Sequence, residues 1–157
     1  MKKLICMLLA VLLLISMTAC GAEKKAQKPV EAPDMQAVFS DMSPYLPADA
    51  LAFDGEYVFN AYGVKPDDCK QQVVVSYYDG AVTAEIWMIE AVSKDALATI
   101  KQMAENRLNS MCEQFRSYDP KAYELAEDAE LFTEGNCLVL IVSENAQQLL
   151  QCYRDAQ

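Results

Sequence analysis

Residues 72–92 read QVVVSYYDGAVTAEIWMIEAV, and this stretch decides the fold. Val and Tyr dominate residues 72–78, which is typical of a β-strand. Asp79-Gly80 follows, and this dipeptide is the strongest short signal for a two-residue hairpin turn. Residues 81–92 supply the returning strand. The sequence therefore predicts an antiparallel hairpin here.

A long helix is predicted directly after this hairpin. From Ser93, apolar residues recur at helical spacing for about 25 residues. Asp119-Pro120 ends the pattern, because the residue before a proline is disfavoured in a helix. The remaining elements are the two strands of a second hairpin and a C-terminal amphipathic helix, at residues 130–133, 137–143 and 144–156.

Two short helices are predicted before the first hairpin. Asp34 is a good N-cap for a helix at residues 35–42, and Asp54 begins another that Gly63 stops. The order strand–strand–helix then occurs twice. We expect an α+β fold, in which a four-stranded, mainly antiparallel sheet of two hairpins is packed by a long central helix, a C-terminal helix and two short N-terminal helices.

The chain has no histidine and carries 23 acidic against 13 basic side chains, a formal charge of −10. Without an imidazole, Ser-His-Asp catalysis, Cys-His catalysis and His-based zinc sites are excluded. Nucleic-acid binding is not expected, because phosphate contacts are made largely by clustered Lys and Arg. A length of 157 residues favours one domain. We predict no catalytic residue, no metal site and no cofactor.

The first 20 residues read as a lipoprotein leader. A cationic start at residues 1–3 precedes twelve apolar residues, fewer than the about 20 that span a bilayer. The following Met17-Thr18-Ala19-Cys20 resembles a bacterial lipobox. It predicts cleavage between Ala19 and Cys20, S-diacylglycerol on the Cys20 thiol, and a new amino group that can be acylated. The alternatives are an ordinary signal peptide cut after Ala19, or an uncleaved anchor.

Removal of the signal peptide, residues 1–19, leaves a mature chain with 11 basic and 23 acidic side chains. Residues 20–33 are polar and Lys-rich with two prolines, which predicts a lipidated cysteine followed by a flexible tether. Residues 34–157 form the single α+β domain. We expect the protein at the cell membrane, lipid-anchored on the extracytoplasmic face, with the bilayer as partner through Cys20.

Three side chains are candidates for ligand binding or for packing. Glu85 and Glu90 flank Trp87, and a tryptophan beside a carboxylate can line a ligand site. Trp87 shares a strand face with Ile89, however, which favours a core position. Arg107 in the long helix can hold an anion, pair with a sheet carboxylate or form a surface salt bridge. The acidic doublets, such as Asp67-Asp68, are best interpreted as solvated surface.

Four cysteines remain in the mature domain: Cys69, Cys112, Cys137 and Cys152. Export permits disulfides, and four cysteines allow three full pairings, so the sequence leaves their redox state open. No Cys-x-x-Cys motif is present. Buried thiols that act as small hydrophobic groups are the favoured interpretation.

Several short segments occur in a characteristic order after the lipobox and tether: Tyr62–Asp68, Ala84-Glu85-Ile86, Arg107, Phe115–Pro120, Gly135-Asn136 and Leu140–Ser143. This ordered set resembles the lipoproteins of domain-of-unknown-function family 4358 from Gram-positive, Clostridia-type bacteria. The resemblance covers about residues 34–155. It implies an envelope location and this fold, and it implies no activity.

Three function classes remain open. We favour a non-enzymatic, membrane-anchored extracytoplasmic module that binds an envelope protein or a small ligand. A carboxylate- or cysteine-dependent envelope enzyme is the first alternative. The second is an accessory solute-binding component of a transporter, although a domain of this size cannot readily build two lobes around a cleft.

Overall fold

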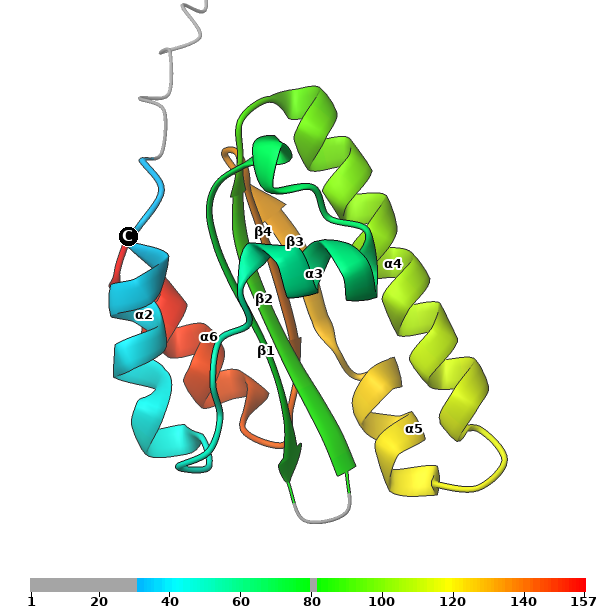
Figure 1. Cartoon of the computed structure of the whole chain (residues 1–157). Coiled ribbons are helices and arrows are strands. Elements are labelled where there is room, and N and C mark those ends of the chain that lie inside the picture. Colours follow the sequence, from blue (N-terminus) through cyan, green and yellow to red (C-terminus); the bar gives the residue numbers. More distant parts are fainter. Residues whose placement is uncertain (1–30, 80–81) are drawn as a thin grey trace, which may run out of the picture.

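The computed structural model describes residues 31–79 and 82–157. A central antiparallel sheet in the order β1-β2-β4-β3 lies between two layers of helices (Figure 1). Helices α3, α4 and α5 cover one face of the sheet, and α2 and α6 cover the other. This arrangement confirms the predicted α+β fold with its four-stranded sheet. Within the described ranges, no helix is both long enough and apolar enough to cross a membrane.

The sheet consists of the two predicted hairpins. β1 (Cys69–Asp79) pairs with β2 (Val82–Ala91), and β3 (Glu130–Glu134) pairs with β4 (Cys137–Val142). β2 and β4 then pair with each other, also antiparallel, which joins the two hairpins into one sheet. The predicted turn at Asp79-Gly80 includes Gly80, which lies outside the described residues.

The two short N-terminal helices form as predicted from their caps. The Asp34 carboxylate accepts hydrogen bonds from two backbone N–H groups at the start of α2 (Met35–Met42). Asp54 caps α3 (Gly55–Tyr62) by accepting from the backbone N–H of Tyr57. Gly63 ends α3 with φ of 81°, a conformation that glycine adopts without steric cost. A 3-10 turn follows each helix, at Ser43–Tyr45 and Pro66–Asp68.

The second half of the chain contains one helix that the sequence pattern did not predict. α4 (Lys94–Phe115) ends before Asp119, and a separate helix α5 (Pro120–Glu127) follows. The Asp119 carboxylate accepts from the backbone N–H of Ala122, and Pro120 occupies the first turn. Asp119-Pro120, interpreted above as a helix end, is therefore also a helix start. The C-terminal helix α6 (Ala146–Asp155) was predicted.

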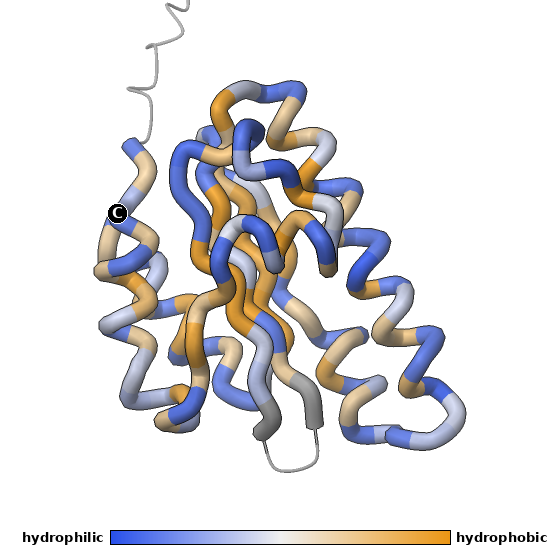
Figure 2. Tube along the Cα trace, in the orientation of Figure 1, coloured by the Kyte–Doolittle hydropathy of each residue, from blue (hydrophilic) through white to orange (hydrophobic). Residues whose placement is uncertain are grey.

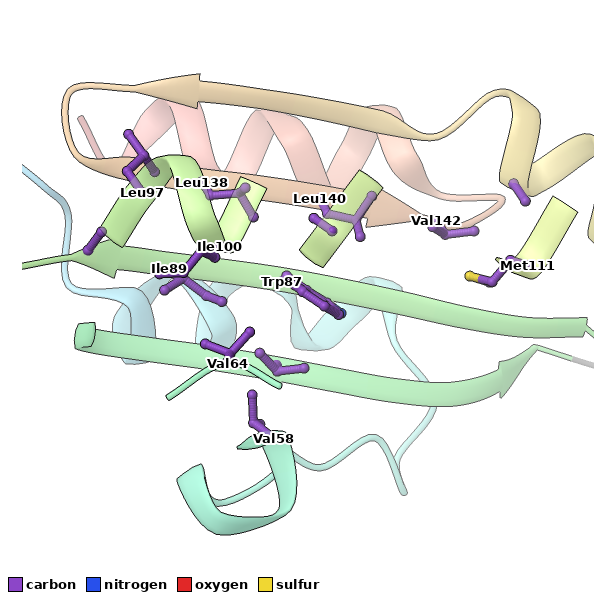
Figure 3. Close-up of a cluster of buried hydrophobic side chains, with 14 of the residues drawn as sticks. Val58, Val64, Trp87, Ile89, Leu97, Ile100, Met111, Leu138, Leu140 and Val142 are labelled. Carbon is purple, nitrogen blue, oxygen red and sulfur yellow. The ribbon is translucent and has the colours of Figure 1, made fainter. Parts of the chain in front are cut away.

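Each face of the sheet carries its own hydrophobic core. On the α3–α4–α5 face, Trp87 and Ile89 of β2 and Leu138 and Leu140 of β4 pack against α4 residues such as Ile100 (Figure 3). The core of the other face includes residues of β1, β2 and β4 together with apolar side chains of α2 and α6. Apolar colour accordingly follows the strands, whereas polar residues lie along the outer sides of the helices (Figure 2).

The predictions for residues 1–30 lie outside the described part of the chain. They include the signal peptide, the cleavage after Ala19, the lipidation of Cys20 and most of the tether.

Candidate functional site

A buried ion pair joins the sheet to α4. Glu85 on β2 has no exposed surface, and its carboxylate accepts hydrogen bonds from Nε of Arg107 at 2.9 and 3.1 Å. Nη2 of Arg107 also donates to Glu85. The side chain of Arg107 is 26% exposed. Of the three roles considered for Arg107, the structure therefore shows the pairing with a sheet carboxylate, and this bidentate geometry is the strong form of such a pair.

Tyr62, the last residue of α3, lies against this pair. Its ring is 4.8 Å from the ring of Trp87 between centroids, and Cζ of Arg107 is 5.7 Å from its centroid. Burial, and secondly the nearby Glu85 carboxylate, raise the pKa of the Tyr62 hydroxyl, which is hydrogen-bonded to Glu85. The hydrogen bonds to Glu85 likewise raise the pKa of Arg107. Glu85, Arg107 and Tyr62 thus form one polar network that fixes α3 and α4 on the sheet.

Trp87 belongs to the core and not to a ligand surface. Its side chain is fully buried within the cluster of Figure 3, which confirms the favoured interpretation of its strand position. Its indole Nε1 has no hydrogen-bond partner among the described residues. Trp87 therefore helps to position Tyr62, because the two rings pack against each other.

A shallow pocket of about 240 Å³ opens between α3 and α4, above this network. We call it the Arg107 pocket. Its lining residues are Ala61, Tyr62, Met103, Asn106, Arg107 and Ser110. The four residues from α4 follow at intervals of three, one and three, so they share one face of the helix. Asn106 and Ser110 are exposed, whereas Tyr62 and Arg107 are half-buried.

The polar groups that line the Arg107 pocket are mainly hydrogen-bond donors. None of the described residues that line it carries a carboxylate or a thiol. The carboxylate behind it, Glu85, is fully buried and accepts hydrogen bonds from Arg107 and Tyr62, so it is not placed to remove a proton from a ligand. The guanidinium, the Asn106 amide and the Ser110 hydroxyl can instead donate hydrogen bonds to a ligand.

Three large apolar side chains on α3 and in the segment before it are exposed. Tyr57 and Phe59 on α3 are 49% and 45% exposed, and Leu51 in the preceding segment is 71% exposed. The rings of Phe53 and Tyr57 stack with centroids 4.3 Å apart.

A second pocket lies on the other side of the molecule. It measures about 380 Å³ and is lined by residues of α2 and the segment that follows it, namely Phe39, Ser40, Ser43, Leu46, Pro47, Ala48 and Ala50. Although it is larger than the Arg107 pocket, none of these residues is charged. It offers fewer polar groups that could orient a ligand.

The four cysteines of the domain are free thiols in the structure. Cys69 and Cys112 pack on the α4 side of the sheet, and Cys137 and Cys152 on the α6 side. Burial raises the pKa of the Cys69 thiol to about 11, and burial also raises the pKa of Cys137. Raised pKa values are the opposite of what a nucleophilic cysteine needs. Within residues 31–79 and 82–157, no group of three or more acidic or cysteine side chains is placed to hold a metal ion.

The sequence pointed to Glu85 and Arg107, but it did not reveal that Tyr62 contacts this ion pair. It also did not point to Met103, Asn106 and Ser110, which line the pocket. The signal was present in α4, because positions 103, 106, 107 and 110 share one helix face. What the sequence did not show is that the end of α3 lies against that face.

Comparison with known protein families shows where this chain belongs. Residues 45–143 match the model of a family described as DUF4358, a domain of unknown function. The matched span contains the whole sheet together with α3, α4 and α5, and it leaves α2 and α6 outside. No curated protein and no solved structure matches the chain.

Proposed function

We propose a role for this chain, which belongs to the DUF4358 family because the model of that family matches more than half of it. The role is supported by the Arg107 pocket together with the N-terminal sequence. The protein is a lipoprotein anchored to the extracytoplasmic face of the cell membrane, and it acts without catalysis as a binding module of the cell envelope. The Arg107 pocket and the exposed side of α3 form its binding surface.

The anchoring part of this proposal is supported by the sequence alone. Twelve apolar residues after a cationic start, followed by Met17-Thr18-Ala19-Cys20, provide the leader and the cysteine that lipidation requires. A diacylglycerol group supplies two acyl chains, and two chains hold a protein stably on a bilayer. The domain begins at about residue 34, so residues 20–33 separate it from the lipid.

The proposed binding role rests on one observation: the carboxylate of Glu85, behind the Arg107 pocket, is buried and hydrogen-bonded. Because the carboxylate is buried and accepts hydrogen bonds from Arg107 and Tyr62, it stabilises the fold and is not accessible to a ligand. The groups that remain available in the pocket are hydrogen-bond donors next to apolar surface. Such a set orients a ligand or a side chain of a partner, and it lacks the pair of acid and base that hydrolysis needs.

The anchor is tested by replacing the lipidated cysteine. We expect Cys20→Ala to abolish palmitate incorporation and processing in cells and to shift the protein out of the membrane fraction. Cys69→Ala is the matched control, because it removes a cysteine of the domain and is expected to leave labelling unchanged. Palmitate labelling that persists in Cys20→Ala contradicts the anchor.

The binding surface is tested by photo-cross-linking in native membranes. A photoreactive amino acid replaces Asn106, which lines the Arg107 pocket, or Asn109, which is also exposed on α4 but lies outside the pocket lining. We expect a discrete adduct from position 106 and none, or much less, from position 109. Absence of an adduct at position 106, or equal adducts at both positions, contradicts the proposal.

A further inference from the structure

The guanidinium of Arg107 is bonded to the protein along one edge and open along another. An arginine carries five N–H donors in a planar fork, and each of two edges of the fork can hold a carboxylate. In Arg107 the edge formed by Nε and Nη2 is bonded to Glu85. Within residues 31–79 and 82–157, Nη1 and the second N–H of Nη2 have no hydrogen-bond partner. These N–H groups form the open edge.

The open edge lies on the side of the guanidinium that faces the Arg107 pocket. Glu85 is fully buried, so the edge bonded to it points into the domain. The side chain of Arg107 is nevertheless 26% exposed, and it lines the pocket. The accessible end of the ion pair is therefore its positive end. Because Coulomb attraction falls with distance, the cation attracts an anion on the open edge more strongly than Glu85, which is farther away, repels it.

Arg107 differs from the other arginines of the chain, Arg116 and Arg154, because its guanidinium is fixed in position. Both of the others are exposed. Among the described residues, neither of them lies within ion-pair distance of a carboxylate. A group that is already ordered loses less conformational entropy when a ligand binds. Arg107 is thus a preorganised cation for an anionic ligand.

Two further side chains of α4 add donors to the same pocket. Oδ1 of Asn106 accepts from Nε2 of Gln102 at 3.1 Å, which leaves the Nδ2 group of Asn106 to donate. Ser110 carries a hydroxyl one turn further along the helix. The hydroxyl of Tyr62, the remaining polar side chain of the lining, is already hydrogen-bonded to Glu85. The pocket therefore complements a group that carries acceptor oxygens.

A carboxylate fits this set of donors. Its two oxygens match one edge of a guanidinium, and each oxygen can accept a further hydrogen bond. The cost of removing an ion from water grows steeply with its charge, so a singly charged carboxylate suits a pocket beside a neutral ion pair better than a phosphate dianion does.

We propose that the Arg107 pocket binds a carboxylate, which lies on the open edge of Arg107 and also accepts from Nδ2 of Asn106 and Oγ of Ser110. The carboxylate belongs either to a polypeptide partner or to a small acid. This proposal rests on the proposed function and names the chemical group that is recognised at the same site.

The test follows the Nε–H signal of Arg107 by NMR in the isotope-labelled, lipidated full-length protein in micelles of a neutral detergent. The probes are acetate, acetamide, inorganic phosphate, and N-acetylated, amidated tripeptides with either Asp or Asn between two alanines. Each is titrated at neutral pH and constant ionic strength. The Nε–H signals of Arg116 and Arg154 are internal controls.

Two charge-matched variants test the location of the site. Asn106→Asp brings a like charge into the pocket at an exposed position of α4. Gln148→Glu adds the same charge at an exposed position of α6, which covers the other face of the sheet (Figure 1). Arg107 itself is retained, because its ion pair with Glu85 stabilises the fold.

We expect acetate and the Asp peptide to shift the Arg107 signal saturably, and acetamide and the Asn peptide to leave it almost unchanged. Asn106→Asp should weaken acetate binding at least about threefold, because a like charge then lies beside the bound carboxylate, whereas Gln148→Glu should leave it unchanged. Tighter binding of the Asp peptide than of acetate assigns the carboxylate to a polypeptide, and the reverse order assigns it to a small acid.

The proposal is overturned if neither acetate nor the Asp peptide gives a saturable shift, or if acetate and acetamide give equal shifts. Equal weakening by Asn106→Asp and Gln148→Glu, or tighter binding of inorganic phosphate than of acetate, overturns it as well.

Failure of the proposed function is a separate outcome. A partner cross-linked at Asn106 of a protein whose Arg107 signal does not respond to acetate refutes the carboxylate and leaves the binding role intact. Conversely, equal adducts at positions 106 and 109, together with a saturable response to acetate, refute the partner surface and leave the carboxylate site intact.

Discussion

Removing the guanidinium of Arg107 should destabilise the domain far more than removing an exposed basic side chain from the same helix. The change Arg107→Met leaves the fully buried Glu85 carboxylate without its charged partner. Breaking a buried ion pair from one side costs about 3–5 kcal/mol. Arg107 is 26% exposed and Tyr62 remains as a donor to Glu85, so we expect a loss near the lower end, about 3 kcal/mol. That loss lowers Tm by about 10 °C.

A double-mutant cycle separates the ion pair from side-chain packing. Glu85→Leu leaves Arg107, which can turn towards solvent, and we expect it to cost about 1–2 kcal/mol. The double variant Glu85→Leu with Arg107→Met has no buried charge, and its stability should lie within about 1 kcal/mol of the wild type. The two single changes are therefore strongly non-additive.

The assay is urea unfolding, followed by circular dichroism and by the fluorescence of Trp87, the single tryptophan of the chain. Lys101→Met is the matched control on α4. Lys101 pairs with Glu105 at 3.0 Å, but both side chains are exposed, by 47% and 39%, and such pairs contribute less than about 1 kcal/mol. If Arg107→Met costs no more than Lys101→Met, the network does not hold the domain together as described.

Three further predictions follow from individual residues. Because the pKa of Cys69 is raised from 9.0 to about 11 by burial, its alkylation at about pH 8 should be about 100-fold slower in the folded protein than in urea; equal rates would contradict the packing assigned to it. Burial raises the pKa values of Tyr62 and Tyr153 above the ordinary 10. The free energy of unfolding should therefore stay level up to about pH 10 and fall above it. If the absorbance of tyrosinate reaches its full value while the protein is still folded, the two tyrosines are not buried as the structure shows. Gly63→Ala should cost about 1 kcal/mol, because φ is 81° there while the neighbouring Met103 side chain leaves room for a methyl group at 3.7 Å; a neutral change in urea unfolding would refute the cap.

The strands and most helices were predictable because their signals are local. The Val- and Tyr-rich run at residues 72–78 and the cap at Asp34 act over a few residues, and the structure forms a strand and a helix where these signals predicted them. α5 was not predicted because its buried residues, Ala122 and Ala126, are small and form a weak apolar pattern over eight residues. Their contribution depends on packing against the sheet, which no short window of sequence reveals.

The candidate site was predictable only in part for the same reason. Glu85 was singled out because it flanks Trp87, and Arg107 because a cation in the long helix can pair with a sheet carboxylate. The shared strand face of Trp87 and Ile89 correctly indicated that Trp87 is buried. The pocket itself depends on Tyr62 meeting α4 across 45 positions of the chain. Such a contact is set by the crossing of α3 over the sheet, and a single sequence carries no direct signal for it.

The proposed binding role places the partner of this protein on the surface between α3 and α4. The most direct measurement is the dissociation constant of the partner cross-linked at Asn106, determined with purified lipidated protein. Ser110→Trp fills the Arg107 pocket from an exposed position, and Asn109→Trp places the same side chain outside the pocket lining. We expect Ser110→Trp to weaken binding by at least about tenfold, which corresponds to about 1.4 kcal/mol, and Asn109→Trp to leave it unchanged. Unchanged affinity in Ser110→Trp, or an equal loss in both variants, would contradict it.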